Sequence, residues 1–274
     1  MKKLTILVVL IVLVVILVVG SFNRNQAVIL VSTGADHRSN PSSSLKLLTF
    51  NIRHGTGLDG RLDLERIARI IRKSGANLVG LNEVDMRLSR SGFTNQVKEL
   101  AAMLKMNYAF GPTVRKELGS YGNAILSNYP IESAANHILP GQNYTEKRGL
   151  LTARVSLSPE RAVYLLTTHL SLDKKEREGQ LEWIEAYIKG LDHPFILMGD
   201  FNSELDAGFA YEPLLTGIKS FPAEDAREEI DLYFSNLDLE IISGQAIKTI
   251  ASDHLPVLIE LLLAEEKISL SPLE

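Results

Sequence analysis

The chain has 274 residues, of which 45% are hydrophobic and 23% are charged, so a buried core of ordinary globular type is expected. It contains no cysteine, which excludes disulfide bonds and thiolate metal sites. Any metal ion must therefore be held by oxygen or imidazole ligands. Such ligands favour a hard cation, Mg²⁺ or Mn²⁺.

The N-terminal segment is predicted to be a membrane anchor. Two lysines, Lys2 and Lys3, precede an uncharged and almost wholly apolar run from Leu4 to Phe22. As a helix, this run would span roughly 28 Å, close to the hydrocarbon core of a bilayer. Its length favours an uncleaved anchor over residues 1–22, and a cleaved signal peptide is the alternative. The basic end is expected to stay cytoplasmic, with the rest of the chain outside the cytoplasm.

The remaining residues are predicted to form one catalytic domain between two non-catalytic segments. Residues 23–44 are expected to be a flexible tether, 45–263 the domain and 264–274 a C-terminal tail. The net charge of residues 45–274 is −7. Nucleic-acid binding relies on a basic surface, so this charge disfavours nonspecific binding of DNA.

Apolar periodicity predicts alternating strands and helices through the domain. In chain order, the expected elements are a strand over 46–52, a helix from an N-cap at Asp63 to Gly75, a strand over 78–81, a helix over 94–104, strands over 107–114, 122–131, 150–157 and 161–170, a helix over 174–190, and strands over 195–199, 230–235, 239–249 and 256–263.

The pairing of these strands cannot be wholly parallel. Residues 150–157 and 161–170 are joined by the short turn Ser158-Pro159-Glu160, so they should form an antiparallel hairpin. The fold class is therefore predicted to be α/β, with two mixed sheets and the helices on their outer sides.

Polar groups at strand ends are the main indication of chemistry. The segment Gly199-Asp200-Phe201-Asn202 follows the apolar run 195–198, and Ser252-Asp253-His254 precedes the apolar run 256–259. Asn51, Glu83 and His169 end further strands. Core packing gives no reason for acids and imidazoles at these places, so they indicate a metal-assisted site that cleaves phosphoesters.

Seven short motifs occur in one order along the domain. They are Thr49-Phe50-Asn51-Ile52, Asn82-Glu83-Val84-Asp85, Tyr121-Gly122-Asn123-Ala124-Ile125-Leu126-Ser127, Thr168-His169-Leu170, Gly199-Asp200-Phe201-Asn202, Ile230-Asp231-Leu232-Tyr233 and Ser252-Asp253-His254-Leu255-Pro256. In this order and spacing the chain, from about Leu45 to Leu263, resembles the endonuclease/exonuclease/phosphatase superfamily. The resemblance implies the DNase I-like fold, a four-layer sandwich of two mixed β-sheets packed face to face with helices outside.

The resemblance assigns a metal site and a proton-transfer pair. Glu83 is the expected ligand of Mg²⁺ or Mn²⁺, with Asn51 and Asp253 close by. His254 is the expected base or proton-transfer group, and Asp231 is expected to hold its other ring nitrogen. Each acid also has a plainer interpretation as an ordinary acid at a strand end.

Other residues are expected to position the phosphate. Asp200 and Asn202 would orient the nucleophile and bind the phosphoryl group, and His169 would donate to the transition-state oxyanion. The alternatives are a simple turn and a half-buried histidine. The phosphate itself is expected to meet three further residues, Asn123, Arg53 and Arg148. At Arg53 the DNA-repair members of the superfamily usually carry an acid, so the chain departs from them there.

Three functions remain open at this stage. The favoured one is a membrane-tethered, Mg²⁺- or Mn²⁺-dependent phosphodiesterase that acts outside the cytoplasm, as a monomer, on a lipid head group or a small phosphoester. The second is an extracellular or membrane-bound nuclease acting on DNA. The third, a noncatalytic binding domain, is disfavoured because every core catalytic position is filled.

Overall fold

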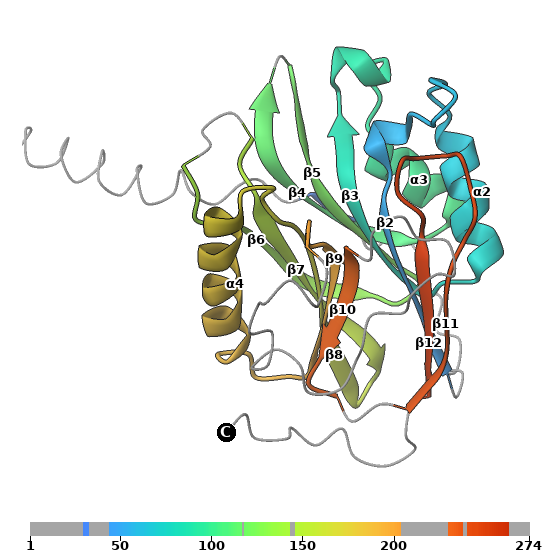
Figure 1. The fold of residues 1–274 in the computed structure, drawn as a ribbon. Helices are drawn as coiled ribbons and strands as arrows, with labels where there is room; N and C mark the ends of the chain where they lie inside the picture. Colours follow the sequence, from blue (N-terminus) through green and yellow to red (C-terminus); the bar gives the residue numbers. More distant parts are fainter. Residues whose placement is uncertain are drawn as a thin grey trace, which may run out of the picture.

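The computed structural model describes residues 30–32, 44–116, 118–142, 146–203, 230–237 and 240–262 (Figure 1). The strands in these ranges are β1 (Leu30–Ser32), β2 (Ser44–Asn51), β3 (Leu78–Met86), β4 (Asn107–Lys116), β5 (Gly119–Ser127), β6 (Ile131–Ile138), β7 (Gly149–Ser158), β8 (Arg161–His169), β9 (Phe195–Asp200), β10 (Asp231–Ser235), β11 (Glu240–Ala246) and β12 (Val257–Leu262). The helices are α2 (Leu64–Ser74), α3 (Gln96–Leu104) and α4 (Lys174–Ile188), with short 3₁₀ turns η1 (Arg53–Gly55) and η2 (Ser89–Ser91).

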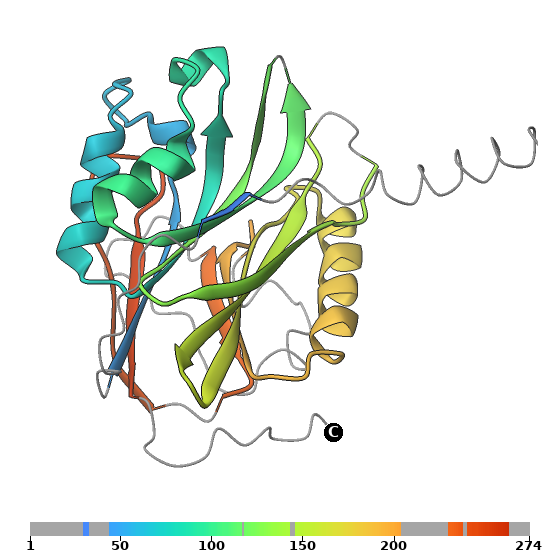
Figure 2. The ribbon, with the colours of Figure 1, turned by 180° about the vertical axis from the view of Figure 1, so that it is seen from behind.

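The described strands form two mixed sheets that pack face to face. One has seven strands in the order β1-β4-β5-β3-β2-β12-β11, and the other has five in the order β10-β9-β8-β7-β6. A buried apolar cluster that includes Leu47, Ile125, Met198 and Tyr233 fills the space between them. Figure 2 shows α2 and α3 on the outer side of the larger sheet and α4 on the outer side of the smaller one. The predicted α/β sandwich is confirmed, as is the antiparallel hairpin of β7 and β8.

The first long helix begins and ends where the sequence predicts. The Asp63 carboxylate accepts a hydrogen bond from the backbone N–H of Arg66 at 2.8 Å, which satisfies one of the open donors of the first turn. Gly75 ends the helix in the left-handed conformation with φ 68°. Ile67 and Ile71 are buried against the sheet, which explains the apolar spacing of this segment.

Two expectations about chain organisation need correction. The single strand predicted over 122–131 is the end of β5 and the start of β6, because Asn128, Tyr129 and Pro130 turn the chain between them. The tether predicted over 23–44 contains β1, whose backbone pairs antiparallel with β4. The polar residues on both sides of this segment indicate a tether, but the apolar run from Val28 to Val31 consists of residues that favour strands.

The expected membrane anchor over residues 1–22 lies outside the described residues, and so does the expected tail over 264–274. Among the helices in the described ranges, none has the length and apolar character needed to span a bilayer.

A buried tyrosine ties the two sheets together. Tyr233 lies on β10 of the smaller sheet and is 1% exposed. Its hydroxyl accepts a hydrogen bond from the Thr49 N–H at 2.7 Å and donates to the Val257 carbonyl oxygen at 2.5 Å, so it binds two strands of the larger sheet. Buried polar contacts of this kind fix the relative position of the sheets, which a purely apolar interface would leave less well defined.

Candidate active site

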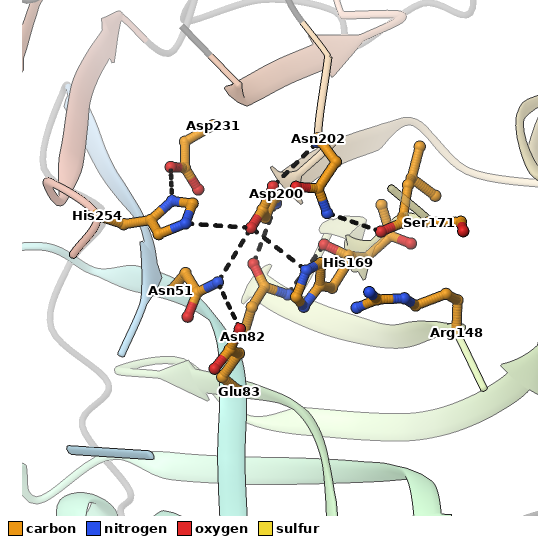
Figure 3. Close-up of polar contacts among 12 residues, drawn as sticks. Asn51, Asn82, Glu83, Arg148, His169, Ser171, Asp200, Asn202, Asp231 and His254 are labelled. Carbon is orange, nitrogen blue, oxygen red and sulfur yellow. Dashed lines mark hydrogen bonds and ion pairs between the residues drawn. The ribbon is translucent and has the colours of Figure 1, made fainter. Parts of the chain in front are cut away.

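The ends of several strands meet at one edge of the sandwich, and the polar residues of the motifs lie there. The parallel strands β2 and β3 carry Asn51 and Glu83, and the parallel strands β8 and β9 end at His169 and Asp200. Antiparallel β10 begins at the same edge. Figure 3 shows these side chains together with Asp231 and His254 in one cluster. Both sheets therefore contribute to a single site.

A β-bulge places Glu83. The pairing of β3 with β5 shifts between Leu81 and Val84, so one residue is inserted in β3 at this point. Glu83 has φ 58°, a left-handed conformation that residues other than glycine adopt rarely. Leu81 and Val84, on either side of the bulge, both pack in the apolar cluster between the larger sheet and helices α2 and α3. This packing fixes the strand before and after the bulge. In a regular strand residue 83 would share the helix-covered face with Leu81. The bulge instead turns the Glu83 carboxylate toward the site.

Asp200 lies at the centre of the cluster and is 1% exposed. Its Oδ2 accepts a hydrogen bond from Asn51 Nδ2 at 3.0 Å and lies 3.4 Å from His169 Nε2 and 3.6 Å from His254 Nε2. Its Oδ1 accepts from the backbone N–H of Asn202 at 3.0 Å. The preceding residue must be glycine, because a Cβ at Gly199 would lie 2.0 Å from a carbonyl oxygen of β8.

Asn82 has a role that the sequence did not assign. Its side chain is completely buried and donates to Asn123 Oδ1 and to the Thr168 carbonyl oxygen, each at 2.9 Å. Its Oδ1 accepts from the Asp200 N–H at 3.1 Å. Asn82 thus joins the two sheets directly beneath the site. Strand alternation would have pointed this amide into the sandwich, and that was the available signal.

His254 and Asp231 form a hydrogen-bonded pair. His254 Nδ1 lies 2.8 Å from Asp231 Oδ2, which leaves Nε2 facing Asp200. Burial alone would lower the pKa of His254, but the bond to Asp231 and the charges of Asp231, Asp200 and Asp253 outweigh it and raise that pKa to about 9. The imidazole of His254 therefore retains a proton readily.

His169 has the opposite electrostatic setting. Burial lowers its pKa to about 4, because the attraction of Asp200 is smaller than the desolvation cost and the positive charges of Arg148 and His254 act in the same direction as burial. His169 is therefore neutral at physiological pH and can donate one N–H. Two imidazoles with pKa values pushed apart in this way are suited to different roles in proton transfer.

Removing His169 should change how the fold responds to acid. A buried neutral histidine favours folding above its unfolded pKa of 6.5, and this contribution is lost as the pH falls toward the folded value of about 4. When the pH is lowered from 7 to 5, the free energy of unfolding of the wild type should therefore fall by about 2 kcal/mol more than that of His169→Gln. Urea unfolding at both pH values measures this difference. His193→Gln, at the opposite end of β9, is the control, and an unchanged acid response of His169→Gln would contradict the prediction.

Glu83 and Asp253 are the carboxylates that fit a divalent cation. Burial raises the pKa of Glu83, and the nearby charges of Asp253 and Asp200 raise it further, against its hydrogen bond from Asn51. A cation would relieve this repulsion. Among the described residues, no group of three His, Cys, Asp or Glu side chains could hold a metal by itself. Two carboxylates, Glu83 and Asp253, would suit a divalent cation that keeps several water ligands.

Asn51 has its amide nitrogen toward the acids. Its Nδ2 donates to Glu83 Oε1 at 3.2 Å as well as to Asp200, and its Oδ1 accepts from the Arg53 N–H at 3.1 Å. In this arrangement the Asn51 amide lies between the carboxylates of Glu83 and Asp200 and donates to both. Its backbone carbonyl accepts from Ser252 Oγ at 2.8 Å, which links β2 to the loop that carries Asp253.

The residues expected to bind phosphate surround this centre at different depths. Arg53 Nε lies 3.4 Å from Asp253 Oδ2. Arg148 is mostly buried and extends toward His169 in Figure 3, with Glu146 3.4 Å away. Asn202 Nδ2 donates to the Leu170 carbonyl oxygen at 2.8 Å. Asn123 Nδ2 donates to the Gly149 carbonyl oxygen at 2.9 Å, so its amide is occupied in holding the scaffold.

Comparison with known proteins agrees with this geometry. The profile of the Endonuclease/Exonuclease/phosphatase family matches residues 48–254. The chain is 31% identical over 172 residues to the uncharacterized protein YbhP of Escherichia coli, covering 58% of this chain and 67% of that protein.

Solved structures show the same fold. An endonuclease/exonuclease/phosphatase from Beutenbergia cavernae aligns with a TM-score of 0.65 and 23% identity, over 80% of this chain and 72% of that one. The mannosyl-6-phosphatase of Bacteroides thetaiotaomicron aligns with a TM-score of 0.61 and 18% identity, over 80% of this chain and all (100%) of that one. The strand-end acids and imidazoles lie within the matched residues, and the chain belongs to the endonuclease/exonuclease/phosphatase family of hydrolases that act on phosphoester bonds.

Proposed function

We propose that this protein is a Mg²⁺- or Mn²⁺-dependent phosphoesterase that hydrolyses a phosphodiester, in a lipid head group or a small phosphoester, by attack of an activated water. The observation that carries the proposal is the shared position of Asp200. Its carboxylate lies within 3.6 Å of a ring nitrogen of both His169 and His254, and an amide from Asn51 links it to Glu83. Such a cluster can orient a water molecule and move its proton.

The residues have separate tasks in the proposed reaction. When bound, the cation would be held by Glu83 and Asp253 and would neutralise charge that develops on the phosphoryl oxygens. Asp231 fixes the His254 ring so that Nε2 faces the reacting groups, where it can accept a proton or return one to the leaving group. Asp200 orients the water, and the neutral His169 donates a hydrogen bond to the phosphoryl oxygen.

Exposed apolar side chains around the site favour a lipid substrate over DNA. They come from several loops at the same edge of the sandwich, and the Leu58 N–H donates to the Ile250 carbonyl oxygen there at 2.9 Å. The set is Leu58, Leu62, Phe93, Leu118, Leu172 and Ile250. Five of these six side chains are aliphatic. Apolar side chains of this kind can enter a bilayer surface, whereas single-stranded nucleic acid is usually bound by aromatic stacking and basic grooves. The charge of −7 over residues 45–274 also disfavours DNA.

The proposed place of action is outside the cytoplasm, at the membrane. This part of the proposal rests on the apolar segment from Leu4 to Phe22 and on the lysines before it. An enzyme tethered to a bilayer would meet lipid head groups at high local concentration, which suits exposed apolar loops around its site.

A substrate screen tests the proposed function. The purified protein is offered phospholipid vesicles, soluble phosphomonoesters and phosphodiesters, and plasmid DNA, with Mg²⁺, with Mn²⁺ and with EDTA. We expect turnover of a lipid or small phosphoester that needs the metal and stops in EDTA. Cleavage of DNA at a comparable rate would favour the nuclease alternative, and EDTA-resistant turnover would exclude the metal-dependent mechanism.

Vesicle hydrolysis should depend on the apolar loops. The double variant Phe93→Ser and Leu172→Ser should reduce turnover of vesicle lipid about tenfold, because two apolar side chains no longer enter the bilayer surface. Turnover of a soluble ester should change little. Ile242→Ser is the control, since Ile242 is also an exposed apolar residue (52%) but lies on β11 toward the other end of the sandwich. Equal losses on both substrates would show that the loops act by another route.

A further inference from the structure

Beyond Glu83, β3 continues and carries a buried acid that the proposed reaction does not use. The Asp85 side chain is 0% exposed. Its Oδ1 accepts a hydrogen bond from Arg90 Nη2 at 2.7 Å and its Oδ2 accepts from Arg90 Nε at 2.8 Å, a two-bond fork. The backbone N–H of Asp85 donates to Gln96 Oε1 at 2.9 Å. Both oxygens of this fully buried carboxylate therefore accept hydrogen bonds from one arginine, Arg90.

The bulge at Glu83 decides which way this pair faces. After the bulge, Asp85 is paired with Tyr121 of β5. Tyr121 is two residues from Asn123, whose side chain meets Asn82 between the sheets. Side chains two apart in a strand share a face, so Asp85 and Tyr121 project from the face that bears the active site. The smaller sheet does not cover β3 and β5 at their upper ends in Figure 1.

Arg90 is held in one orientation by two contacts. Asp85 takes its Nε and Nη2, and its guanidinium carbon lies 5.1 Å from the centre of the Tyr121 ring. The side chain is nevertheless 46% exposed. Both hydrogen bonds to Asp85 use Nε and Nη2, so within the described residues Nη1 is left without a hydrogen-bond partner. The hydrogen bonds to Asp85 raise the pKa of Arg90, and the charge of Glu83 adds to this effect, so the guanidinium is within electrostatic reach of the proposed metal ligand.

We propose that Arg90 is a preset binding site for a second phosphate or carboxylate group of the substrate, beside the phosphoester that is cleaved. This inference rests on the proposed function and narrows its substrate class to phosphoesters with two anionic groups. An arginine whose orientation is already fixed loses little conformational freedom on binding, and its planar N–H groups suit phosphate and carboxylate oxygens. Arg53 differs, because its own acid, Asp253, belongs to the proposed metal site.

The test compares two diesters with the same leaving group. They are 4-nitrophenyl ethyl phosphate and 4-nitrophenyl 2-phosphonoethyl phosphate, which carries the second anionic group. With saturating Mg²⁺, the wild type should have a kcat/KM at least tenfold higher for the second ester. Arg90→Gln should reduce this ratio about tenfold. Arg87→Gln removes another exposed arginine, three residues earlier in the chain, and should retain the ratio. An unchanged ratio in Arg90→Gln, or no preference in the wild type, would overturn the inference.

A second variant separates binding from folding. Arg90→Gln leaves the buried Asp85 without its partner, so the double variant Asp85→Asn and Arg90→Gln is measured with it, together with the unfolding midpoint of each. A ratio that stays low in the double variant supports a binding role. A ratio that returns to the wild-type value would show that Arg90 only stabilises the fold.

A direct binding measurement tests the Arg90 anion site independently of whether the protein is a phosphoesterase. Calorimetric titration with ethylphosphonate and with 1,2-ethanediphosphonate, in metal-free buffer, needs no turnover. Tighter binding of the diphosphonate by the wild type, lost in Arg90→Gln, would support the anion site even if neither ester were hydrolysed. Equal binding of both probes would reject the site even if the enzyme proved to be a phosphoesterase.

Discussion

Replacing Glu83 by Gln is expected to reduce phosphoesterase turnover roughly a thousandfold while leaving the protein folded. Glu83 is the carboxylate that the β3 bulge turns toward Asp200 and Asp253. Glutamine has nearly the same shape and can still accept the Asn51 hydrogen bond, but it lacks the charge that a divalent cation needs. Steady-state kinetics with Mg²⁺ and Mn²⁺ measure the loss.

A folding measurement makes this prediction specific to the metal. Burial and the neighbouring acids raise the pKa of Glu83, so removing its charge should leave the unfolding midpoint without metal unchanged or higher. The increase in midpoint that Mg²⁺ gives to the wild type should disappear in Glu83→Gln, because a ligand stabilises only the state that binds it. Glu99→Gln, an exposed position on α3, is the control. A fully active Glu83→Gln protein would remove Glu83 from the metal site.

The second large effect is expected at His254. His254→Ala should lower kcat between about a hundredfold and ten-thousandfold, the range typical for loss of a proton-transfer group. Its ring is oriented by the 2.8 Å bond between Nδ1 and Asp231, so Asp231→Asn should lower kcat as well, with KM changed less. Both variants are measured on a soluble ester. His193→Ala, which removes a partly exposed histidine outside the site, should be unaffected.

The pKa of His254 provides a direct check of the pair. The bond to Asp231 and the surrounding carboxylates raise that pKa to about 9 against the effect of burial. Asp231→Asn should therefore lower it, and NMR titration of the imidazole in the metal-free protein would show the decrease. If the pKa of His254 did not change in Asp231→Asn, the orienting role of Asp231 would be wrong.

The sequence predicted the centre of the site better than its surroundings. Asp200 and His254 could be found because polar groups at the ends of apolar strands have no packing role. Asn82 and Asp85 lie inside a strand, where a polar residue gives no sign of its partner, and the partner of the Asp85 carboxylate, Arg90, comes from the later turn η2. The bulge at Glu83 was also hidden, since an inserted residue leaves no mark on the apolar pattern of Leu78-Val79-Gly80-Leu81.

Strand boundaries show a similar limit. Apolar runs located the core strands, whereas β6 was missed apart from Ile131, because most of its positions are polar or partly exposed, which weakens the pattern. Strand β1 depends on an edge of β4 that is distant in sequence. Long-range pairing of this kind cannot be derived from local periodicity, even where the fold class is correct.

The Tyr233 bridge means that catalysis depends on how the two halves of the sandwich are aligned. Asn51 and Glu83 belong to the larger sheet, whereas His169, Asp200 and Asp231 belong to the smaller one. A slip of one sheet against the other by a single residue step, about 3.3 Å, would separate these groups while every strand kept its neighbours. The rate of turnover should therefore respond to a change in inter-sheet alignment more sensitively than far-ultraviolet circular dichroism, which reports secondary-structure content.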